Sequence, residues 1–141
     1  SLISKCTTFV TSVFDTRDIK GTRYVMTDGS RFNIDATMIK TSHLFHINYS
    51  GPDLNDRPLL PQQVISGFTC MECDRMFTHE NSPELISGDQ IVYENVGGYT
   101  MSLNPLFIQY FPAVYIRRDD KLIQVRRKWT PEDYIQGTTL I

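Results

Sequence analysis

The architecture of this chain is indicated most clearly by the stretch Val114-Tyr115-Ile116-Arg117-Arg118-Asp119-Asp120-Lys121-Leu122-Ile123-Gln124-Val125. Apolar residues recur at every second position on both sides of Asp119-Asp120, which is typical of two strands joined by a tight turn. A two-residue loop at this dipeptide places Ile116 opposite Ile123, and it also places Val114 opposite Val125. The sequence therefore predicts an antiparallel hairpin with one apolar face.

Two other dipeptides favour hairpins in the same way. Asp28-Gly29 lies between residues 23–27 and 30–34, which are rich in β-branched and aromatic side chains. Gly97-Gly98 lies between residues 91–96 and 99–103. Because such dipeptides adopt the positive φ angles of two-residue turns, we expect a hairpin at each.

A short helix is expected at each end of the chain. Near the amino end, apolar residues recur at helical spacing, namely Leu2, Cys6, Phe9, Val10 and Val13. Near the carboxyl end, Thr130-Pro131-Glu132-Asp133 has a capping residue, a proline at the first helical position and acidic residues in the first turn. Gly137 would end this second helix after about two turns.

Composition favours strands over helices. The chain contains alanine only at Ala36 and Ala113, while isoleucine, threonine, tyrosine, phenylalanine and valine are abundant. A length of 141 residues is close to that of one ordinary domain. The prediction is a single α+β but β-rich domain over residues 1–141. Its antiparallel hairpins would form a small sandwich or a partly open barrel, with a short N-terminal and a short C-terminal helix.

The net charge and the number of cysteines indicate which cellular compartment to expect for the protein. The net charge is −2, and residues 53–94 carry two Lys or Arg against eight Asp or Glu. No apolar run reaches the roughly 20 residues that a membrane span needs. Three cysteines make a closed disulfide framework unfavourable, so we expect a reducing cytoplasmic setting. The low alanine content also fits an AT-rich source such as a phage or virus, in which case the location would be the host cytoplasm or the virion.

A Cys-x2-Cys pair is the strongest chemical signal in the sequence. The stretch Phe68-Thr69-Cys70-Met71-Glu72-Cys73-Asp74-Arg75-Met76-Phe77 resembles the first half of a C2H2 zinc finger. The second half of that pattern, a pair of histidines, does not follow. The fold and DNA-binding role of the finger are therefore not expected here.

Zinc binding is nevertheless one hypothesis for these cysteines. The best ligand set is Cys70, Cys73 and His79, completed by Cys6, His43 or His46. His43 and His46 lie in an expected strand and would point in opposite directions. The alternative is that the cysteines are small buried side chains without a metal. A thioredoxin-like redox role is less favoured, because that role requires a strand that leads into a helix amino terminus.

Nucleic-acid binding is a second alternative, and it rests on the last hairpin. The face opposite its apolar side combines aromatic and basic residues, namely Phe111, Tyr115, Arg117, Arg126 and Lys128. Such a surface can stack bases and pair with phosphates. The other interpretation is a solvated strand whose charges discourage pairing with other sheets.

The sequence contains no motif of a phosphate-binding loop, a nucleophile elbow or a zinc protease. Its carboxylates Asp53, Asp56, Glu72, Asp74, Glu80 and Glu84 lie in turn-rich segments that are expected to be exposed. We therefore predict a non-enzymatic module for protein binding or assembly, without a cofactor unless zinc is bound. Self-association or a protein partner is expected, nucleic acid is the alternative partner, and no membrane is involved.

Overall fold

The fold is described from a computed structural model of the chain, which covers residues 4–51 and 53–139. The chain forms two compact units, Ser1–Asn104 and Pro105–Ile141. Each unit is described by itself. The prediction that residues 1–141 form one domain stays a prediction.

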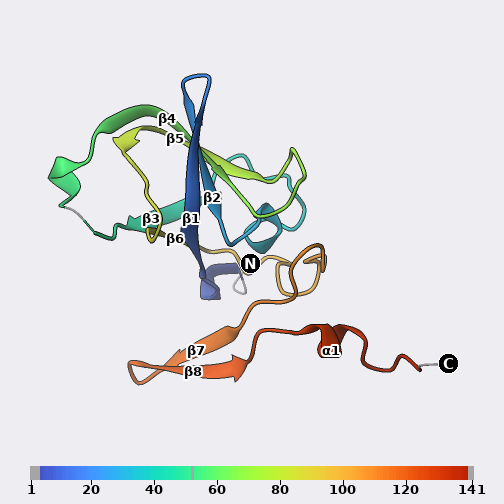
Figure 1. Ribbon diagram of the computed structural model, residues 1–141. Coiled ribbons are helices and arrows are strands. Elements are labelled where there is room, and N and C mark those ends of the chain that lie inside the picture. The colour runs from blue at the N-terminus through green and yellow to red at the C-terminus, as the bar shows by residue number, and fades with distance from the viewer. Residues whose placement is uncertain (1–3, 52, 140–141) are drawn as a thin grey trace. The chain divides into compact units, whose positions relative to one another are not determined.

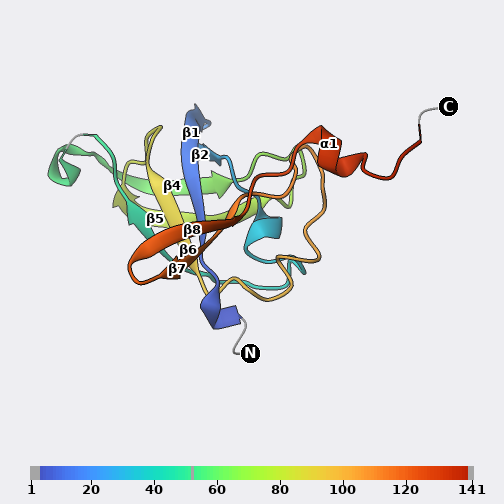
Figure 2. The same cartoon turned by 90° about the horizontal axis from the view of Figure 1, so that it is seen from below.

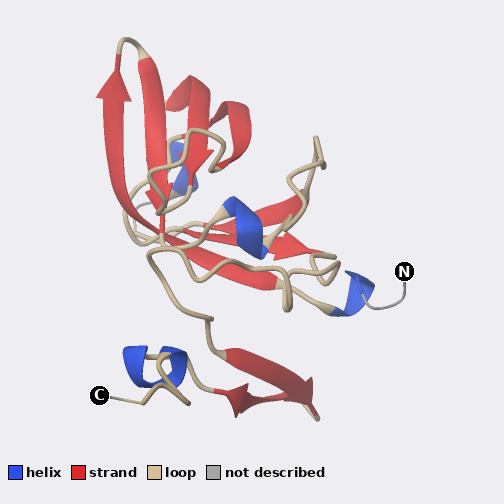
Figure 3. Cartoon of the chain, turned by 90° about the vertical axis from the view of Figure 1, so that its right-hand side faces the viewer, coloured by secondary structure: helices blue, strands red, loops and turns tan. Residues whose placement is uncertain are grey.

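Strands make up more of both units than helices do (Figure 3). The first unit contains β1 (Phe9–Ile19), β2 (Thr22–Thr27), β3 (Leu44–Asn48), β4 (Leu59–Ser66), β5 (Arg75–Pro83) and β6 (Gln90–Glu94). It also contains the short 3-10 helices η1 (Ser4–Cys6), η2 (Arg31–Asn33) and η3 (Leu54–Asp56). The second unit contains β7 (Val114–Arg118), β8 (Lys121–Arg126) and the single helical turn α1 (Pro131–Tyr134).

The six strands of the first unit form one curled, half-barrel sheet in the order β3-β6-β1-β2-β4-β5 (Figures 1 and 2). Only β2 and β4 pair in parallel; the other neighbours are antiparallel. In a flat sheet the two edge strands would lie roughly 24 Å apart, at about 4.8 Å per strand. Instead, Phe45 of β3 lies 4.1 Å from Phe77 of β5 between ring centroids. The β-rich prediction is confirmed, and aromatic rings bring the edges of the sheet together.

The interior of the curled sheet is apolar. Its buried residues come from five of the six strands and from adjoining loops, and they are Val13, Val25, Ile34, Ile65, Met76, Leu85, Ile91, Tyr93 and Val96. Tyr93 is completely buried, and its hydroxyl donates to the sulfur of Met76 at 3.0 Å. Burial also raises the pKa of Tyr93 well above its ordinary value, so the phenol stays neutral.

The expected N-terminal helix is wrong, because Phe9 to Val13 belong to strand β1. Leu2, which contributed to that prediction, lies outside the described residues. Strand β1 turns back into β2 through the two-residue loop Lys20-Gly21, whose φ angles are 50° and 82°. Such positive angles give a two-residue turn that follows the twist of paired strands. This β1–β2 hairpin was not predicted.

The hairpin expected at Asp28-Gly29 is also wrong. Strand β2 ends at Thr27, and the segment after the dipeptide forms the 3-10 helix η2. The Asp28 carboxylate instead accepts from the Thr11 hydroxyl at 2.6 Å and from the Ser12 amide at 2.7 Å. A side chain at Gly29 would collide with the Phe9 ring and the Thr11 hydroxyl. The glycine therefore serves close packing against β1 rather than a turn.

The hairpin expected at Gly97-Gly98 does not form either. Strand β6 ends at Glu94, and residues 97–102 form turns without a returning strand. The partners of β6 are β1 on one side and β3 on the other. Both strands lie much earlier in the sequence. The turn residues near β6 therefore give no information about its pairing with them.

The hairpin at Asp119-Asp120 is confirmed in the second unit. Both aspartates have positive φ angles, 49° and 59°, and Ile116 pairs with Ile123. A bulge between Val114 and Tyr115 places Val114 opposite Arg126 instead of Val125. The C-terminal helix is confirmed as the turn α1, where the Asp133 carboxylate accepts from the Thr130 amide at 2.8 Å.

Candidate functional site

The Cys-x2-Cys segment lies in the loop that joins β4 to β5. The last strand pair of this hairpin is Ser66 with Arg75, and the Gly67 amide donates to the Asp74 carbonyl at 2.9 Å. Residues 68–73 therefore form a six-residue loop at the end of a regular hairpin. A rigid hairpin positions such a loop more precisely than a free segment would.

The Asp74 carboxylate holds this loop in place. Its Oδ2 accepts from the Thr69 amide at 3.0 Å and from the Thr69 hydroxyl at 2.6 Å. Its Oδ1 accepts from the Ser30 hydroxyl at 3.0 Å and from the Arg31 amide at 2.7 Å, which fixes the loop to η2. Asp74 is only 2% exposed, contrary to the prediction that it is a surface carboxylate. Hydrogen bonds from four donors compensate for the burial of its charge.

Gly67 permits this arrangement. A β-carbon at this position would overlap the Asp74 carboxylate, which could move aside only by giving up hydrogen bonds from its four donors. The sequence does not predict that Gly67 and Asp74 are in contact. A glycine seven residues before an aspartate, with threonine between them, is too weak a signal to predict such contact.

The loop presents three ionisable side chains to solvent, since Cys70, Glu72 and Cys73 are all exposed. Two thiols and one carboxyl group within four residues can donate protons, attack electrophiles or bind soft ions. The cysteines are not the small buried side chains of the alternative interpretation.

The predicted zinc ligands do not come together. The described residues contain no group of three or more His, Cys, Asp or Glu side chains that could hold a metal ion. His79 is half-buried on β5, where its ring lies 5.7 Å from Phe45 and 5.9 Å from Phe77. Burial lowers the pKa of His79, so the neutral ring is favoured in this apolar contact.

The other candidate ligands lie in separate surroundings. His43 places its ring edge against Tyr93, at 6.2 Å, and burial lowers the pKa of His43. His46 is more exposed and lies 3.3 Å from the Glu94 carboxylate. Cys6 lies in η1 near the chain start.

The five residues of the predicted nucleic-acid face are partly used within the second unit. The Arg126 guanidinium lies 5.1 Å from the centre of the Phe111 ring and donates to the Pro112 carbonyl at 3.3 Å. Phe111 also meets Trp129 edge-on at 4.8 Å. Tyr115, Arg117 and Lys128 are exposed, and Tyr115 pairs with Gln124 across the hairpin.

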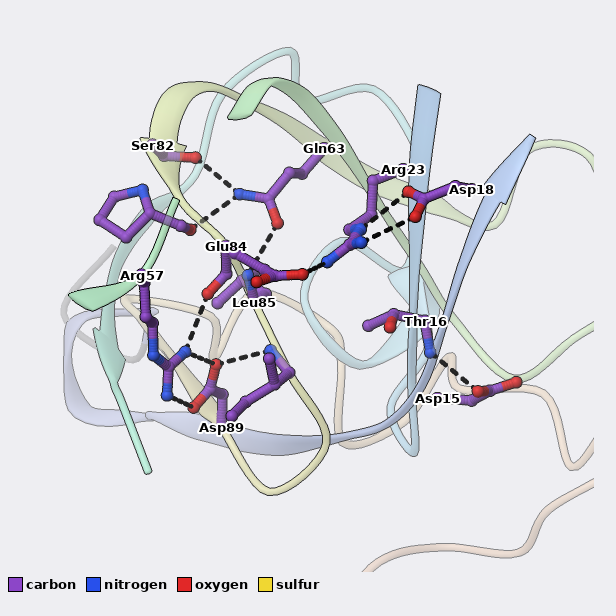
Figure 4. A network of polar contacts seen from close by, with 12 residues as sticks. Asp15, Thr16, Asp18, Arg23, Arg57, Gln63, Ser82, Glu84, Leu85 and Asp89 are labelled. Carbon is purple, nitrogen blue, oxygen red and sulfur yellow. Dashed lines mark hydrogen bonds and ion pairs between the residues drawn. The ribbon is translucent and has the colours of Figure 1, made fainter. Parts of the chain in front are cut away.

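Sequence reasoning missed a buried polar network in the first unit (Figure 4). Arg57 and Asp89 form an ion pair at 2.6 Å with side chains 3% and 0% exposed. Burial alone would raise the pKa of Asp89, but hydrogen bonds from Arg57 and from the Ser50 and Ile86 amides hold it below its ordinary value. This pair ties the loop before β4 to the loop before β6. Nothing near Arg57 or Asp89 in the sequence marks them as partners.

The adjoining contacts of the network are also structural. The Gln63 amide nitrogen donates to Ser82 and Pro83, each at 2.9 Å, and its oxygen accepts from the Leu85 amide at 2.8 Å. Arg23 bridges the carboxylates of Asp18 and Glu84. The network therefore makes the first unit more rigid, whereas the loop of residues 68–73 carries the exposed thiol and carboxyl groups.

Solved structures with a similar fold include several decarboxylases. A diaminopimelate decarboxylase matches 95% of this chain with a TM-score of 0.79 and 19% identity, over 34% of its own length. The Helicobacter pylori diaminopimelate decarboxylase in complex with L-lysine matches 95% of the chain with a TM-score of 0.73 and 19% identity, over 32% of its length. The Paramecium bursaria Chlorella virus arginine decarboxylase bound to agmatine matches 71% of the chain with a TM-score of 0.57 and 24% identity, over 27% of its length. This chain therefore spans about a third of the enzymes that it resembles.

Sequence comparison adds nothing further, since no family model and no curated protein sequence matches the chain. The structural similarity corrects the functional predictions. The fold is that of a part of known enzymes, so the prediction of a non-enzymatic binding or assembly module is wrong. Neither the zinc-binding and nucleic-acid alternatives nor a viral structural role is supported by these similarities.

Within residues 4–51 and 53–139, the chain has no helix with the length and apolar character needed to span a membrane.

Proposed function

We propose that this chain is the β-rich part of an amino-acid decarboxylase. The observation that carries the proposal is the TM-score of 0.79 to a diaminopimelate decarboxylase over 95% of the chain. The fold covers only about a third of that enzyme, so the remaining part of the active site would come from elsewhere in the enzyme.

The proposed substrate is an amino acid with a second basic nitrogen. The similar enzymes are named for diaminopimelate and arginine, and their structures contain L-lysine and agmatine. All four molecules carry a basic group besides the one at the reacting carbon. The excess of Asp and Glu in residues 53–94 of this chain has the complementary charge.

The loop of residues 68–73 is the proposed contribution of this chain to the chemistry. Decarboxylation removes carbon dioxide from the α-carbon, which then takes up a proton in its place. An active site therefore needs a proton donor near that carbon. Cys70, Glu72 and Cys73 are exposed acids on a loop that Asp74 holds firmly, so one of them is the proposed donor.

A cofactor would be held mainly by the rest of the enzyme. Pyridoxal phosphate supplies an electron sink for this kind of reaction and is bound through a lysine Schiff base. The five lysines of this chain, Lys5, Lys20, Lys40, Lys121 and Lys128, are all exposed. None lies in the buried, water-excluded setting in which a Schiff-base lysine is activated. These residues do not fit the role of the Schiff-base lysine, and no step through the cofactor is assigned to them.

The proposal is tested by measuring carbon dioxide release with the protein in the form that its natural source produces. The substrates are carboxyl-labelled arginine, lysine, ornithine and diaminopimelate, with glutamate as a matched acidic control. We expect release from at least one basic amino acid and none from glutamate. No release from any of the basic amino acids would contradict the proposal.

The role of the loop is tested with the variants Cys70→Ser, Glu72→Gln and Cys73→Ser of the same protein. Loss of a general acid typically lowers the rate roughly a hundredfold to ten-thousandfold. We expect one variant to show this loss in kcat, with the other two close to the unaltered protein. If all three retain full kcat, the donor does not lie on this loop.

Self-association is a further part of the proposal. The second unit exposes large apolar side chains, among them Tyr115, Leu122 and Val125, each more than half exposed. Such residues are enriched where subunits or domains meet. We propose that a second copy or the rest of the enzyme covers them, and that the enzyme acts in the cytoplasm.

A further inference from the structure

The two loop cysteines share a feature that the decarboxylase proposal does not require. They are separated by only two residues, and both are exposed at the end of the β4–β5 hairpin. Each lies directly beside one of the residues that close the loop, Cys70 beside Thr69 and Cys73 beside Asp74.

Three contacts hold the ends of the loop together. The Asp74 carboxylate accepts from both the amide and the hydroxyl of Thr69, at 3.0 and 2.6 Å. Two residues before Thr69, the Gly67 amide donates to the Asp74 carbonyl at 2.9 Å. Since Cys70 and Cys73 are the next residues inward, these contacts restrict how far apart the two thiols can move.

A turn inside the loop also limits the distance between the two thiols. The Asp74 amide donates to the Met71 carbonyl at 3.0 Å, which makes residues 71–74 a tight turn. Cys73 is the third residue of this turn, and Cys70 precedes its first residue. The chain therefore folds back between the two cysteines. A disulfide needs Cα atoms about 4.4–6.8 Å apart, which is shorter than the span of three extended residues.

We propose that Cys70 and Cys73 form a dithiol site that reacts with low-molecular-weight disulfides, such as oxidised glutathione, and closes to a disulfide within the loop. This site differs from a thioredoxin-like motif, because it lies in a hairpin loop rather than at the start of a helix. It needs no zinc. It shares Cys70 and Cys73 with the set of proposed proton donors, so the tests below do not use decarboxylase activity as a readout.

The reaction is a pair of thiol–disulfide exchanges. The thiolate of one cysteine attacks oxidised glutathione, which forms a mixed disulfide and releases one glutathione thiolate. The thiolate of the other cysteine then attacks the protein sulfur of that mixed disulfide and releases the second glutathione. The two thiol protons pass through solvent to the two glutathione thiolates. The protein loses two hydrogen atoms, and oxidised glutathione is reduced to two molecules of glutathione.

The first experiment measures the intact mass of the 141-residue chain after reaction with oxidised glutathione under native conditions. The chain carries Cys6→Ser, so that Cys70 and Cys73 are its only thiols. We expect a mass lower by two hydrogen atoms, no attached glutathione and no covalent dimer. Two stably attached glutathiones, a covalent dimer or an unreacted chain would each overturn the proposal.

Matched single-cysteine variants identify the mechanism. With Cys70→Ser or Cys73→Ser in the same background, the second exchange has no attacking thiol. We expect each variant to retain one glutathione per chain. Loss of glutathione from either variant would mean that another group resolves the mixed disulfide, and the proposed pair would be wrong.

The second experiment asks whether the folded loop brings the thiols together. The equilibrium between the dithiol and the disulfide is measured against a glutathione buffer, once for the folded chain and once in denaturing urea. We expect folding to favour the disulfide by roughly tenfold or more, because the loop ends are already joined. A disulfide that is equally or less favoured in the folded chain would contradict the role assigned to the loop contacts.

Thermodynamic linkage supplies an independent readout of the same ratio. A tenfold preference of the folded state for the disulfide must appear as about 1.4 kcal/mol of added stability in the oxidised chain. The variant Thr69→Ala removes the hydroxyl contact with Asp74 but keeps the amide contact. We expect it to lower the folded-state preference severalfold. An unchanged preference would mean that the Thr69–Asp74 contact does not position the thiols.

Discussion

At the scale of single residues, buried polar groups determine how this chain presents its exposed ones. Asp74 is the main example, because one carboxylate accepts from Ser30, Arg31 and Thr69 and thereby fixes the loop that carries Cys70 and Cys73. The sequence alone indicated the two cysteines but not this aspartate. Residues 72–75 are four consecutive polar or small residues, and such a run is expected to be exposed. Only the fold shows that the Asp74 carboxylate points inward.

Asp74 gives the first prediction. The variant Asp74→Ala leaves four donors without their acceptor in a buried site, and hydrogen bonds to a charged group contribute about 1.5–3 kcal/mol each. We expect the free energy of unfolding to fall by about 3 kcal/mol, measured by urea denaturation. The matched control is Glu72→Ala on the same loop, whose exposed side chain should change stability by less than about 0.5 kcal/mol. Equal effects of the two variants would contradict the assigned role of Asp74.

His79 gives a prediction about pH. Burial lowers its pKa in the folded chain, whereas an unfolded histidine titrates near about 6.5. The unfolded state therefore binds more protons as the pH falls below about 6.5, and stability must decrease there. We expect the free energy of unfolding to decline from pH 7 to pH 5.

The variant His79→Phe tests the source of this decline, since a phenyl ring can keep the contacts with Phe45 and Phe77. We expect a shallower pH dependence in the variant. Some dependence should remain, because burial lowers the pKa of His43 as well. A variant with the full wild-type slope would show that His79 is not responsible.

At the scale of elements, turn chemistry was predictable only where it acts locally. Asp119-Asp120 forms the expected hairpin, because its two strands pair only with each other among the described residues of the second unit. Asp28-Gly29 has the same sequence signal, yet Asp28 is occupied by Thr11 and Ser12, and Gly29 packs under Phe9. The parallel pairing of β2 with β4 and the position of β6 between β1 and β3 depend on distant residues. No local pattern could have predicted them.

The unpredicted turn at Lys20-Gly21 gives a test at this scale. Gly21 has a φ of +82°, and a β-carbon there would touch nothing within 4 Å. The variant Gly21→Ala should therefore lose about 1 kcal/mol of stability through backbone strain alone. Gly98→Ala is the matched control, because Gly98 also has open space but no positive φ is found there. Thermal denaturation should separate the two variants, and a Gly21→Ala variant as stable as Gly98→Ala would contradict the assigned turn.

At the scale of the whole molecule, the six-stranded sheet is curled into a half-barrel, and the fold resembles that of solved decarboxylases. Composition predicted a β-rich chain but could not show that the sheet curls into a half-barrel. The curl depends on contacts between strands at opposite ends of the strand order, β3 and β5. The rings of Phe45 on β3 and of Phe77 and His79 on β5 make these contacts, and no local sequence pattern marks the two strands as neighbours.

Nuclear Overhauser effects between these rings test the curled sheet most directly. The centroid of Phe45 lies 4.1 Å from that of Phe77 and 5.7 Å from that of His79, so cross-peaks between their ring protons are expected in the intact chain. In a flat sheet with the same strand order, roughly 24 Å would separate the edge strands and no such cross-peak could arise. Observed cross-peaks from Phe45 to both rings would support the half-barrel and the decarboxylase-like fold. Their absence in a folded sample would contradict both.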